Sequence, residues 1–371
     1  MTMHPPSLIV TVLAFLLMLG PLIVLHELGH YLVARCFGVR ARAFSIGFGH
    51  ELLGWTDRRG TRWKIAALPL GGYVQFEGDA NAAGLPAAEI AALSAGEREG
   101  IFWFKPLWQR TLIVLAGPVT NLLVAFAIFF AFNLAYGRIT PAPVIAGFAD
   151  PSPARAAGLR IGDRIVAIDG APITSFDQIR EKVWPFPGDR LRITAARGRT
   201  RITVVVPIAT STRRDAFGHV TEVGQIGIAA GPPQILRAGP WQAARLAVGD
   251  QIAILRLMVI GIDQIIEGRR SVRELGGPVR IAQVSGEQLA LGWADFVYFV
   301  AFISINLAFI NLLPIPTLDG GHLAFYAAEA LRGRPVGLRG QEWAFRTGLA
   351  LVLCLMLFVT ANDLASLKLF G

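Results

Sequence analysis

Charged residues and cysteines are both scarce in this chain. Of its 371 residues only 16% are charged while 53% are hydrophobic, and only two are cysteines. So little charge argues against an ordinary soluble protein and favours a membrane protein. Cys36 and Cys354 both fall in or beside long apolar stretches, so a disulfide-stabilised scaffold is excluded as well.

Basic residues are missing from the start of the chain, where no Lys or Arg precedes the first apolar stretch. A signal peptide begins with a basic segment and ends at a small-residue cleavage site. Because neither is found, we expect this stretch to be a retained membrane span.

The net charge of +9 is scattered instead of concentrated in a basic arm. We therefore expect no nucleic acid as a partner and attribute the positive charge to contact with anionic membrane lipid.

Four stretches are long and apolar enough to cross the hydrocarbon core of a bilayer, which takes about 20 helical residues. They predict transmembrane helices in the segments 1–37, 111–137, 294–322 and 323–371, the last of which starts with a cytoplasmic loop. The predicted fold class is therefore a polytopic α-helical membrane protein with four transmembrane helices.

The basic residues also predict the orientation of these helices. The loop after the first helix is rich in Arg and Lys, and the loop before the fourth has four arginines between Arg332 and Arg346. By the positive-inside rule both loops are cytoplasmic, so both chain termini lie outside.

Residues 241–267 are apolar too, but charged residues recur through them. We expect an amphipathic helix at the membrane interface there, within a linker at 211–293.

Two strand-forming segments, "RAFSIGFGHELLGW" and "TRWKIAALPLGGYVQF", flank turn residues within the segment 38–79. They predict a β-element on the cytoplasmic side that re-enters the membrane. A sheet can do so only where its edges pair with protein or line a cavity. A plain cytosolic hairpin is the alternative. Residues 80–110 are expected to form a linker to the second helix.

Short strands separated by turn residues return at 138–210. Within this segment, "SPARAAGLRIGDRIVAIDG" resembles the sequence pattern of PDZ domains. We expect one β-rich PDZ domain on the outer side of the membrane, where it would take up an extended peptide by strand addition.

A polar motif, "HELGH", interrupts the first predicted transmembrane helix. His26 and His30 are four residues apart, so both imidazoles project from one face of a helix and can bind one Zn²⁺, while Glu27 is placed to activate water. An ionisable side chain in a bilayer costs roughly 3 kcal/mol on insertion scales. Metal binding explains all three such residues, whereas a buried core histidine explains at most one.

A catalytic zinc site normally has a third protein ligand. Asp319 in "NLLPIPTLDGGH" is the candidate, because the predicted topology brings the end of the third helix to the same cytoplasmic side as His26 and His30. A fifth span at 241–267 would instead place Asp319 outside. The prolines of this motif are expected to end the helix early and to turn the chain back towards the metal.

Five motifs follow one another along the chain: HELGH, "LAGPVTN" at 115–121, the PDZ-like segment, "GGPVRIA" at 276–282 and "NLLPIPTLDGG". Over nearly its whole length the chain thereby resembles the site-2 protease family of intramembrane zinc metalloproteases. It is most similar to the bacterial RseP type, but with a single PDZ domain. The resemblance implies that His26, His30 and Asp319 ligate Zn²⁺ and that Glu27 activates water.

The resemblance also implies residues that bind substrate. Strands around Gly71 and Gly72 would present the substrate, and Asn311 would hydrogen-bond it or orient the site, with helix capping an equal alternative for Asn311. Arg280 of GGPVRIA stands where a small or apolar residue is usual. We expect it in a solvated loop or beside lipid headgroups.

The implied function is hydrolysis of peptide bonds within or near the transmembrane segments of single-span proteins that a site-1 protease has already cut. Truncated anti-sigma factors and signal-peptide remnants are the implied substrates. The implied location is the bacterial inner membrane, with the active site in its cytoplasmic half and the PDZ domain in the periplasm.

The residues alone leave two other functions open. A metal transporter would also place His and Asp in membrane spans, but it should show polar residues at matching depth in several helices, or an inverted repeat. A non-catalytic membrane scaffold built around the PDZ domain would need no HExxH motif. Zinc content separates the scaffold from the other two, and cleavage of a reporter separates protease from transporter.

Overall fold

The computed structural model describes residues 6–78, 98–214, 220–231, 233–269 and 276–366. The chain divides into two compact units, and each is described by itself. The first comprises Met1–Ile128 and Gly276–Ala361, and the second comprises Phe129–Leu275 and Asn362–Gly371. Of the predicted segments, the greater part of the linker at 80–110 lies outside the described residues.

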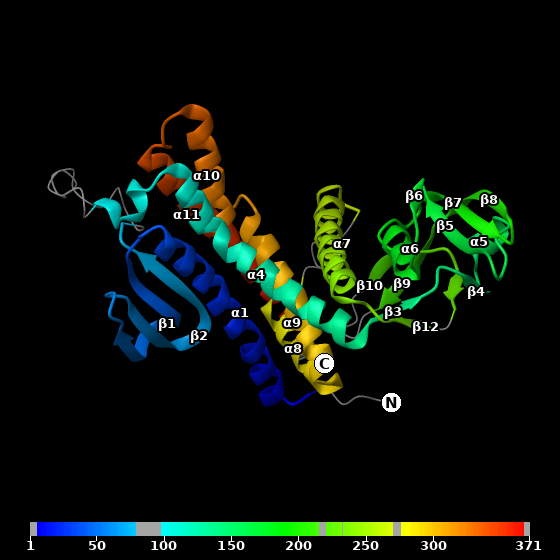
Figure 1. The fold of residues 1–371 in the computed structure, drawn as a ribbon, viewed down its shortest axis with the longest axis horizontal. Coiled ribbons are helices and arrows are strands. Elements are labelled where there is room, and N and C mark those ends of the chain that lie inside the picture. The colour runs from blue at the N-terminus through cyan, green and yellow to red at the C-terminus, as the bar shows by residue number, and fades with distance from the viewer. Residues whose placement is uncertain (1–5, 79–97, 215–219, 232, 270–275, 367–371) are drawn as a thin grey trace. The chain divides into compact units, whose positions relative to one another are not determined.

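Four helices of the described chain are long and apolar enough to cross a membrane (Figure 1). They are α1 (Leu8–Cys36), α4 (Leu107–Tyr136), α9 (Trp293–Leu312) and α11 (Leu338–Ser366). Each of the four overlaps one of the segments that the hydropathy of the sequence predicts. The helix α7 (Pro240–Ile266) has 27 residues but is not one of the four. Its interfacial position stays a prediction.

The core around α1 joins segments that are far apart in the chain. Met18 and Leu22 of α1 are buried in one apolar cluster with Phe296 and Ile303 of α9. A further helix, α8 (Pro278–Leu291), packs against both α1 and α9. The sequence analysis expected only a linker here, so the structure differs from that expectation. Pro278 is the first residue of α8, a position where its fixed φ favours a helix.

Arg280 is part of helix α8. The sequence analysis expected this residue in a solvated loop or beside lipid headgroups. The structure places it in the first turn of α8, so the loop is wrong, and the headgroup contact stays a prediction. In the middle of the helix Gly286 is buried, and a Cβ there would lie 2.9 Å from the hydroxyl of Thr11 in α1. Small residues at this position therefore let α8 approach α1 closely.

Two long antiparallel strands, β1 (Ala41–Thr56) and β2 (Arg62–Phe76), form a hairpin that lies alongside α1 (Figure 1). Asp57 closes its turn by accepting hydrogen bonds from the N–H groups of Arg59 and Thr61. Phe44 and Trp63 stack on each other and pack against Tyr31 of α1. This aromatic group fixes the hairpin to the helix that carries HELGH.

The outer part of the hairpin carries exposed apolar side chains: Phe48, Leu52, Leu53, Trp55 and Leu68. An apolar patch of this kind on a hairpin marks a surface that contacts lipid or protein. The exposure is compatible with a re-entrant β-element, and its depth in the membrane stays a prediction.

Helix α9 ends where two prolines follow in quick succession. Leu313 is extended, with ψ 142°, as expected for a residue before proline. Neither Pro314 nor Pro316 has an N–H to continue the helix. After a tight turn, α10 (Asp319–Arg332) begins. The predicted early end of the helix is confirmed, because Asp319 starts a separate helix and does not extend the third span.

The second unit contains α7 and a set of short strands and helices. Its short elements are β3 (Arg138–Pro141), β4 (Ile145–Phe148), α5 (Pro153–Ala156), β5 (Arg164–Ile168), β6 (Ala171–Pro172), α6 (Phe176–Val183), β7 (Arg190–Arg197), β8 (Thr200–Pro207), β9 (Ala209–Arg214), β10 (Val220–Gln225), β11 (Ile228–Ala230) and β12 (Pro233–Leu236). The largest sheet has the order β6-β5-β7-β8. One buried cluster, which includes Ile165, Ile168, Ile179 and Ile193, forms its core.

The β-structure of this unit continues beyond residue 210, where the sequence analysis expected it to end. Strand β11 pairs with β4, and β12 pairs with β3, so the last strands of this unit pair with its first two strands. An ion pair reinforces the interior: Asp163 is 1% exposed and receives the Arg197 guanidinium at 2.7 Å. That hydrogen bond holds the pKa of the Asp163 carboxyl below its usual value.

Candidate metal centre

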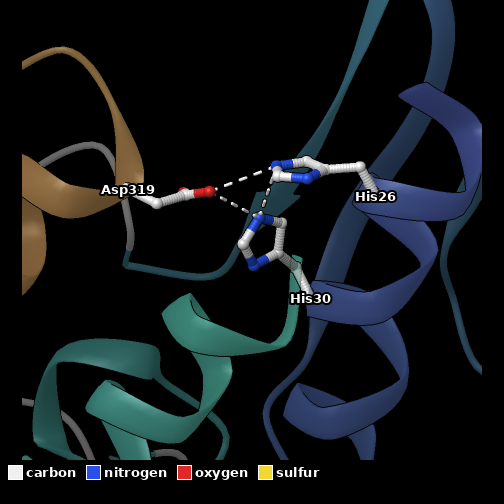
Figure 2. A group of neighbouring side chains, drawn as sticks. All are labelled: His26, His30 and Asp319. Carbon is white, nitrogen blue, oxygen red and sulfur yellow. Dashed lines mark hydrogen bonds and ion pairs between the residues drawn. The ribbon is translucent and has the colours of Figure 1, made fainter. Parts of the chain in front are cut away.

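Three ligand-type side chains converge from two distant parts of the first unit. His26 and His30 are one helical turn apart on α1, with their Nε2 atoms 3.2 Å from each other. Asp319 points its Oδ2 at both rings, 3.1 Å from His26 Nε2 and 3.5 Å from His30 Nε2 (Figure 2). Each histidine is only 8% exposed. Among the described residues these three form the one group suited to a metal ion.

The spacing of the three atoms fits zinc. In a tetrahedral site zinc lies about 2.0–2.2 Å from imidazole nitrogens and carboxylate oxygens, which places its ligand atoms roughly 3.3–3.5 Å apart. Here the corresponding distances are 3.1, 3.2 and 3.5 Å. Two imidazoles and one carboxylate are also a ligand set that catalytic zinc uses, with a fourth position open to solvent or substrate.

Two glycines bring Asp319 to this point. A Cβ at Gly320 would overlap the carbonyl oxygen of Leu313, and one at Gly321 would lie 2.4 Å from the Cα of Pro316. Only residues without side chains let the first turn of α10 fold back so closely on the end of α9. The "DGG" sequence is therefore a requirement of this turn as well as the source of the ligand.

The other end of α10 is held by a largely buried ion pair. Arg110 of α4 donates to Glu329 at 2.6 Å, and these side chains are 7% and 18% exposed. The same guanidinium lies over the rings of Trp103 and Tyr326. Because Glu329 and Asp319 belong to one helix, this ion pair and the turn at Gly320 together set the position of the carboxylate ligand.

Helix α4 forms the floor of the site. Its Ile113 carbonyl oxygen lies 2.8 Å from His30 Nδ1. A carbonyl can only accept, so Nδ1 carries the proton and the lone pair of Nε2 faces Asp319. A Cβ at Gly117 would overlap the His30 imidazole and lie 2.8 Å from His26 Cε1. The glycine of LAGPVTN thus makes room for both rings.

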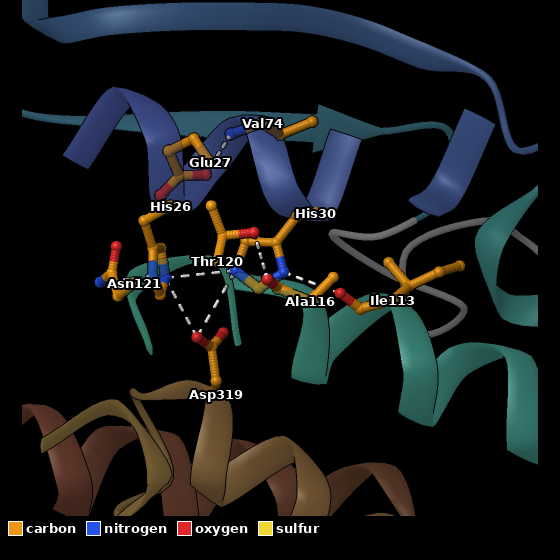
Figure 3. A network of polar contacts seen from close by, with 9 residues as sticks. All are labelled: His26, Glu27, His30, Val74, Ile113, Ala116, Thr120, Asn121 and Asp319. Carbon is orange, nitrogen blue, oxygen red and sulfur yellow. Dashed lines mark hydrogen bonds and ion pairs between the residues drawn. The ribbon is translucent and has the colours of Figure 1, made fainter. Parts of the chain in front are cut away.

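Asn121, the last residue of the same motif, contacts the other histidine. It is fully buried, and its Nδ2 lies 3.2 Å from His26 Nδ1 (Figure 3). The sequence analysis used LAGPVTN only as a family marker and missed both Gly117 and Asn121. A signal was present, because an amide inside an apolar span needs a partner.

Glu27 faces the β-hairpin. Its Oε2 accepts a hydrogen bond of 3.0 Å from the backbone N–H of Val74 in β2, as Figure 3 shows. Gly72 lies next to it, since a Cβ there would be 3.6 Å from Glu27 Cγ. Gly71 has φ 136° beside the Phe48 ring, a conformation that favours glycine. The predicted base and the predicted substrate strand are therefore neighbours, while their roles stay predictions.

Two further polar residues are not members of the metal-ligand group. Asn311 is in the last turn of α9, a position compatible with either of its expected roles. His322 is in the first turn of α10, where its ring packs against Phe345 and Tyr326, and it is not part of the metal-ligand group.

Comparison with known proteins points to one family. The family model described as Peptidase family M50 matches residues 14–355. Two proteins named as zinc metalloproteases, from Agrobacterium fabrum and Rhizobium meliloti, are 42% and 43% identical over 96% and 95% of this chain and 96% of each relative. Metalloprotease MmpA of Caulobacter vibrioides is 34% identical over 96% of both chains.

A solved structure, the PDZ domain of an SdrC-like protein from Listeria monocytogenes, matches with 24% identity and a TM-score of 0.20. It covers 25% of this chain and 92% of that one. A likeness of this size supports no assignment, so the PDZ prediction rests on the sequence pattern.

Proposed function

This chain belongs to peptidase family M50, the site-2 protease family, whose metal is zinc, and on that premise we propose that it is an intramembrane endopeptidase. It hydrolyses peptide bonds within or near the transmembrane segments of single-span proteins. One observation supports this most strongly. The His26, His30 and Asp319 group includes two residues of a helix that is apolar enough to cross a membrane.

The residues have distinct roles in this proposal. His26, His30 and Asp319 hold zinc, which supplies Lewis acidity that makes water a better nucleophile and polarises the scissile carbonyl. Glu27 takes the proton from the attacking water and passes it to the nitrogen of the leaving amine. The Val74 N–H holds Glu27 Oε2, so the carboxylate keeps its orientation through both transfers.

A substrate helix has its amides bonded internally, so it must unwind locally before a peptide bond can be attacked. Strand β2 offers a partner for the unwound segment by strand addition. The closeness of Gly72 to Glu27 supports a substrate strand passing beside the base. Asn311 is retained as a second substrate contact.

The proposed location is the bacterial inner membrane, with both termini outside and the metal centre in the cytoplasmic half. The basic loops after α1 and before α11 support this orientation. The β-rich segment 138–210 is then periplasmic, where a PDZ domain would bind or exclude the outer remnant of a substrate. Substrates already cut by a site-1 protease, such as truncated anti-sigma factors or signal-peptide remnants, suit this arrangement.

The test is cleavage of a single-span reporter with a short outer tail by the purified protein in detergent. Glu27→Gln should keep zinc at the wild-type stoichiometry and lose cleavage, because Glu27 acts on protons and is not a ligand. Glu342→Gln, on the exposed side of α11, is the control and should cleave normally. Absence of zinc from the wild type, or cleavage by Glu27→Gln at near the wild-type rate, contradicts the proposal.

A further inference from the structure

Among the residues that the structure describes, the side-chain amide oxygen of Asn121 has no hydrogen-bond partner. Its side chain is fully buried in α4, and among the described residues no donor reaches its Oδ1. Its Nδ2 lies 3.2 Å from His26 Nδ1. Leaving a buried carbonyl unpaired costs about 1–3 kcal/mol, so the arrangement calls for a physical reason.

The proton on His26 supplies that reason. His26 Nε2 faces His30 Nε2 and Asp319 Oδ2, so this nitrogen is the one that offers its lone pair to a metal. A neutral imidazole with a free Nε2 carries its proton on Nδ1. An Nδ1–H group needs an acceptor, and an amide nitrogen cannot accept.

Turning the Asn121 amide by half a rotation satisfies both groups at once. The oxygen and nitrogen of an amide are told apart by their hydrogen-bond partners. With the two exchanged, Oδ1 accepts the Nδ1–H of His26, and Nδ2 takes the former position of the oxygen. His30 already has the equivalent arrangement, since its Nδ1 lies 2.8 Å from the Ile113 carbonyl oxygen.

We propose that Asn121 is a positioning residue for the metal: its Oδ1 accepts the Nδ1–H of His26 and holds the imidazole in the tautomer that presents Nε2 to zinc. The inference rests on the proposed zinc site. Ser304 Oγ donates to the Asn121 backbone carbonyl at 2.7 Å, which fixes α9 to α4 at the same level. Partners of this kind typically change metal affinity 10–100-fold.

The affinity of the purified full-length protein for zinc tests this, measured by competition with a chelator. Asn121→Leu keeps the approximate size but has no acceptor, so zinc should bind about 10–100-fold more weakly. Asn121→Asp keeps an acceptor oxygen and should bind at least as tightly as the wild type. Ser304→Ala, which loses only the bond to the Asn121 backbone, should bind like the wild type.

Cobalt(II) substitution gives a readout that a merely structural role would not change. In the wild type and in Asn121→Asp, two exchangeable imidazole N–H signals shifted by the cobalt should be seen, from His26 and His30. In Asn121→Leu the His26 signal should exchange rapidly with water while the His30 signal remains. If Asn121→Leu does not fold, the inference is still tested by the cobalt spectrum of the wild type and by the zinc affinity and cobalt spectrum of Asn121→Asp.

Two outcomes overturn the inference. The first is that Asn121→Leu binds zinc as tightly as the wild type does. The second is that the cobalt-substituted wild-type protein shows a protected N–H signal from His30 but none from His26. Failure of the proposed function looks different. A protein that binds zinc through these residues but cleaves no reporter contradicts the protease and leaves the role of Asn121 standing. Unchanged zinc affinity in His26→Ala would remove the site on which both depend.

Discussion

Gly117 has no side chain, and the His30 imidazole lies where one would be. The ring can approach α4 only because of this, and it then reaches the Ile113 carbonyl. A second glycine, Gly29 of HELGH, lets α1 approach α4 from the other side, since a Cβ there would lie 2.6 Å from the Ala116 carbonyl oxygen. At the scale of single residues, the candidate metal centre thus depends on glycines that leave room for the imidazoles and for the close contact of α1 with α4, as well as on the ligand-type side chains.

Gly117→Ala should therefore weaken zinc binding. The new methyl group displaces His30, and overpacking of this kind costs about 1–3 kcal/mol, or roughly 5–150-fold in affinity if the metal site bears it all. Zinc retained against a chelator measures the effect. Gly20→Ala in α1 is the matched control, because a Cβ there meets nothing within 4 Å. Equal zinc affinity in the two variants would contradict the account.

The sequence predicts which residues meet in the candidate metal-ligand group better than it predicts the residues that surround them. His26 and His30 follow from HExxH spacing, and Asp319 follows from counting membrane crossings, because both depend only on periodicity and topology. Gly117 and Asn121 act on imidazoles about 90 residues away in the chain, through the way α1 and α4 cross. No local pattern encodes such a crossing, so their roles needed the structure.

Helix α10 is the element that carries Asp319, the predicted third ligand, and it is held at two places. The close turn at Gly320 and Gly321 fixes its start, and the Arg110–Glu329 pair fixes its far end. A largely buried ion pair contributes little relative to apolar packing, but removing one partner leaves an uncompensated charge. We infer that the pair sets the position of α10 and so of Asp319.

Glu329→Ala should destabilise the first unit by about 3 kcal/mol, since it leaves Arg110 buried without its anion. Zinc affinity should fall as well, because Asp319 loses its support. Thermal unfolding in detergent and chelator competition measure the two effects. Glu342→Ala removes the partner of exposed Arg346 in an i,i+4 pair and should change stability by less than about 0.5 kcal/mol. Similar losses in both variants would show that burial is not the cause.

The sequence also predicts some elements better than others. The break between α9 and α10 follows from Pro314 and Pro316, whose missing N–H groups act whatever surrounds them. Helix α8 was missed because its 14 residues mix apolar and polar types and begin at the proline of a Gly-Gly-Pro sequence that favours a loop. Strands β11 and β12 were missed because they are short and pair with β4 and β3, far back in the chain.

At the scale of the whole molecule, the family match from 14 to 355 covers both units. Four apolar helices, a candidate metal-ligand group with its two histidines on one of them, and a β-hairpin beside the predicted base form a consistent set. Hydropathy and charge predicted how many helices are apolar enough to span a membrane, since both are averaged over long segments of the sequence. The placement of the molecule in the membrane follows from the same quantities and stays a prediction.

The position of the cleaved bond tests the central claim most directly. A single-span reporter with a shortened outer tail is reconstituted with the protein in zinc-containing liposomes, and the products are mapped by mass spectrometry. The account predicts one main cut within or at the edge of the apolar segment, present with the wild type and absent with Glu27→Gln. Cuts confined to parts of the reporter outside the bilayer, or the same products with Glu27→Gln, would contradict it.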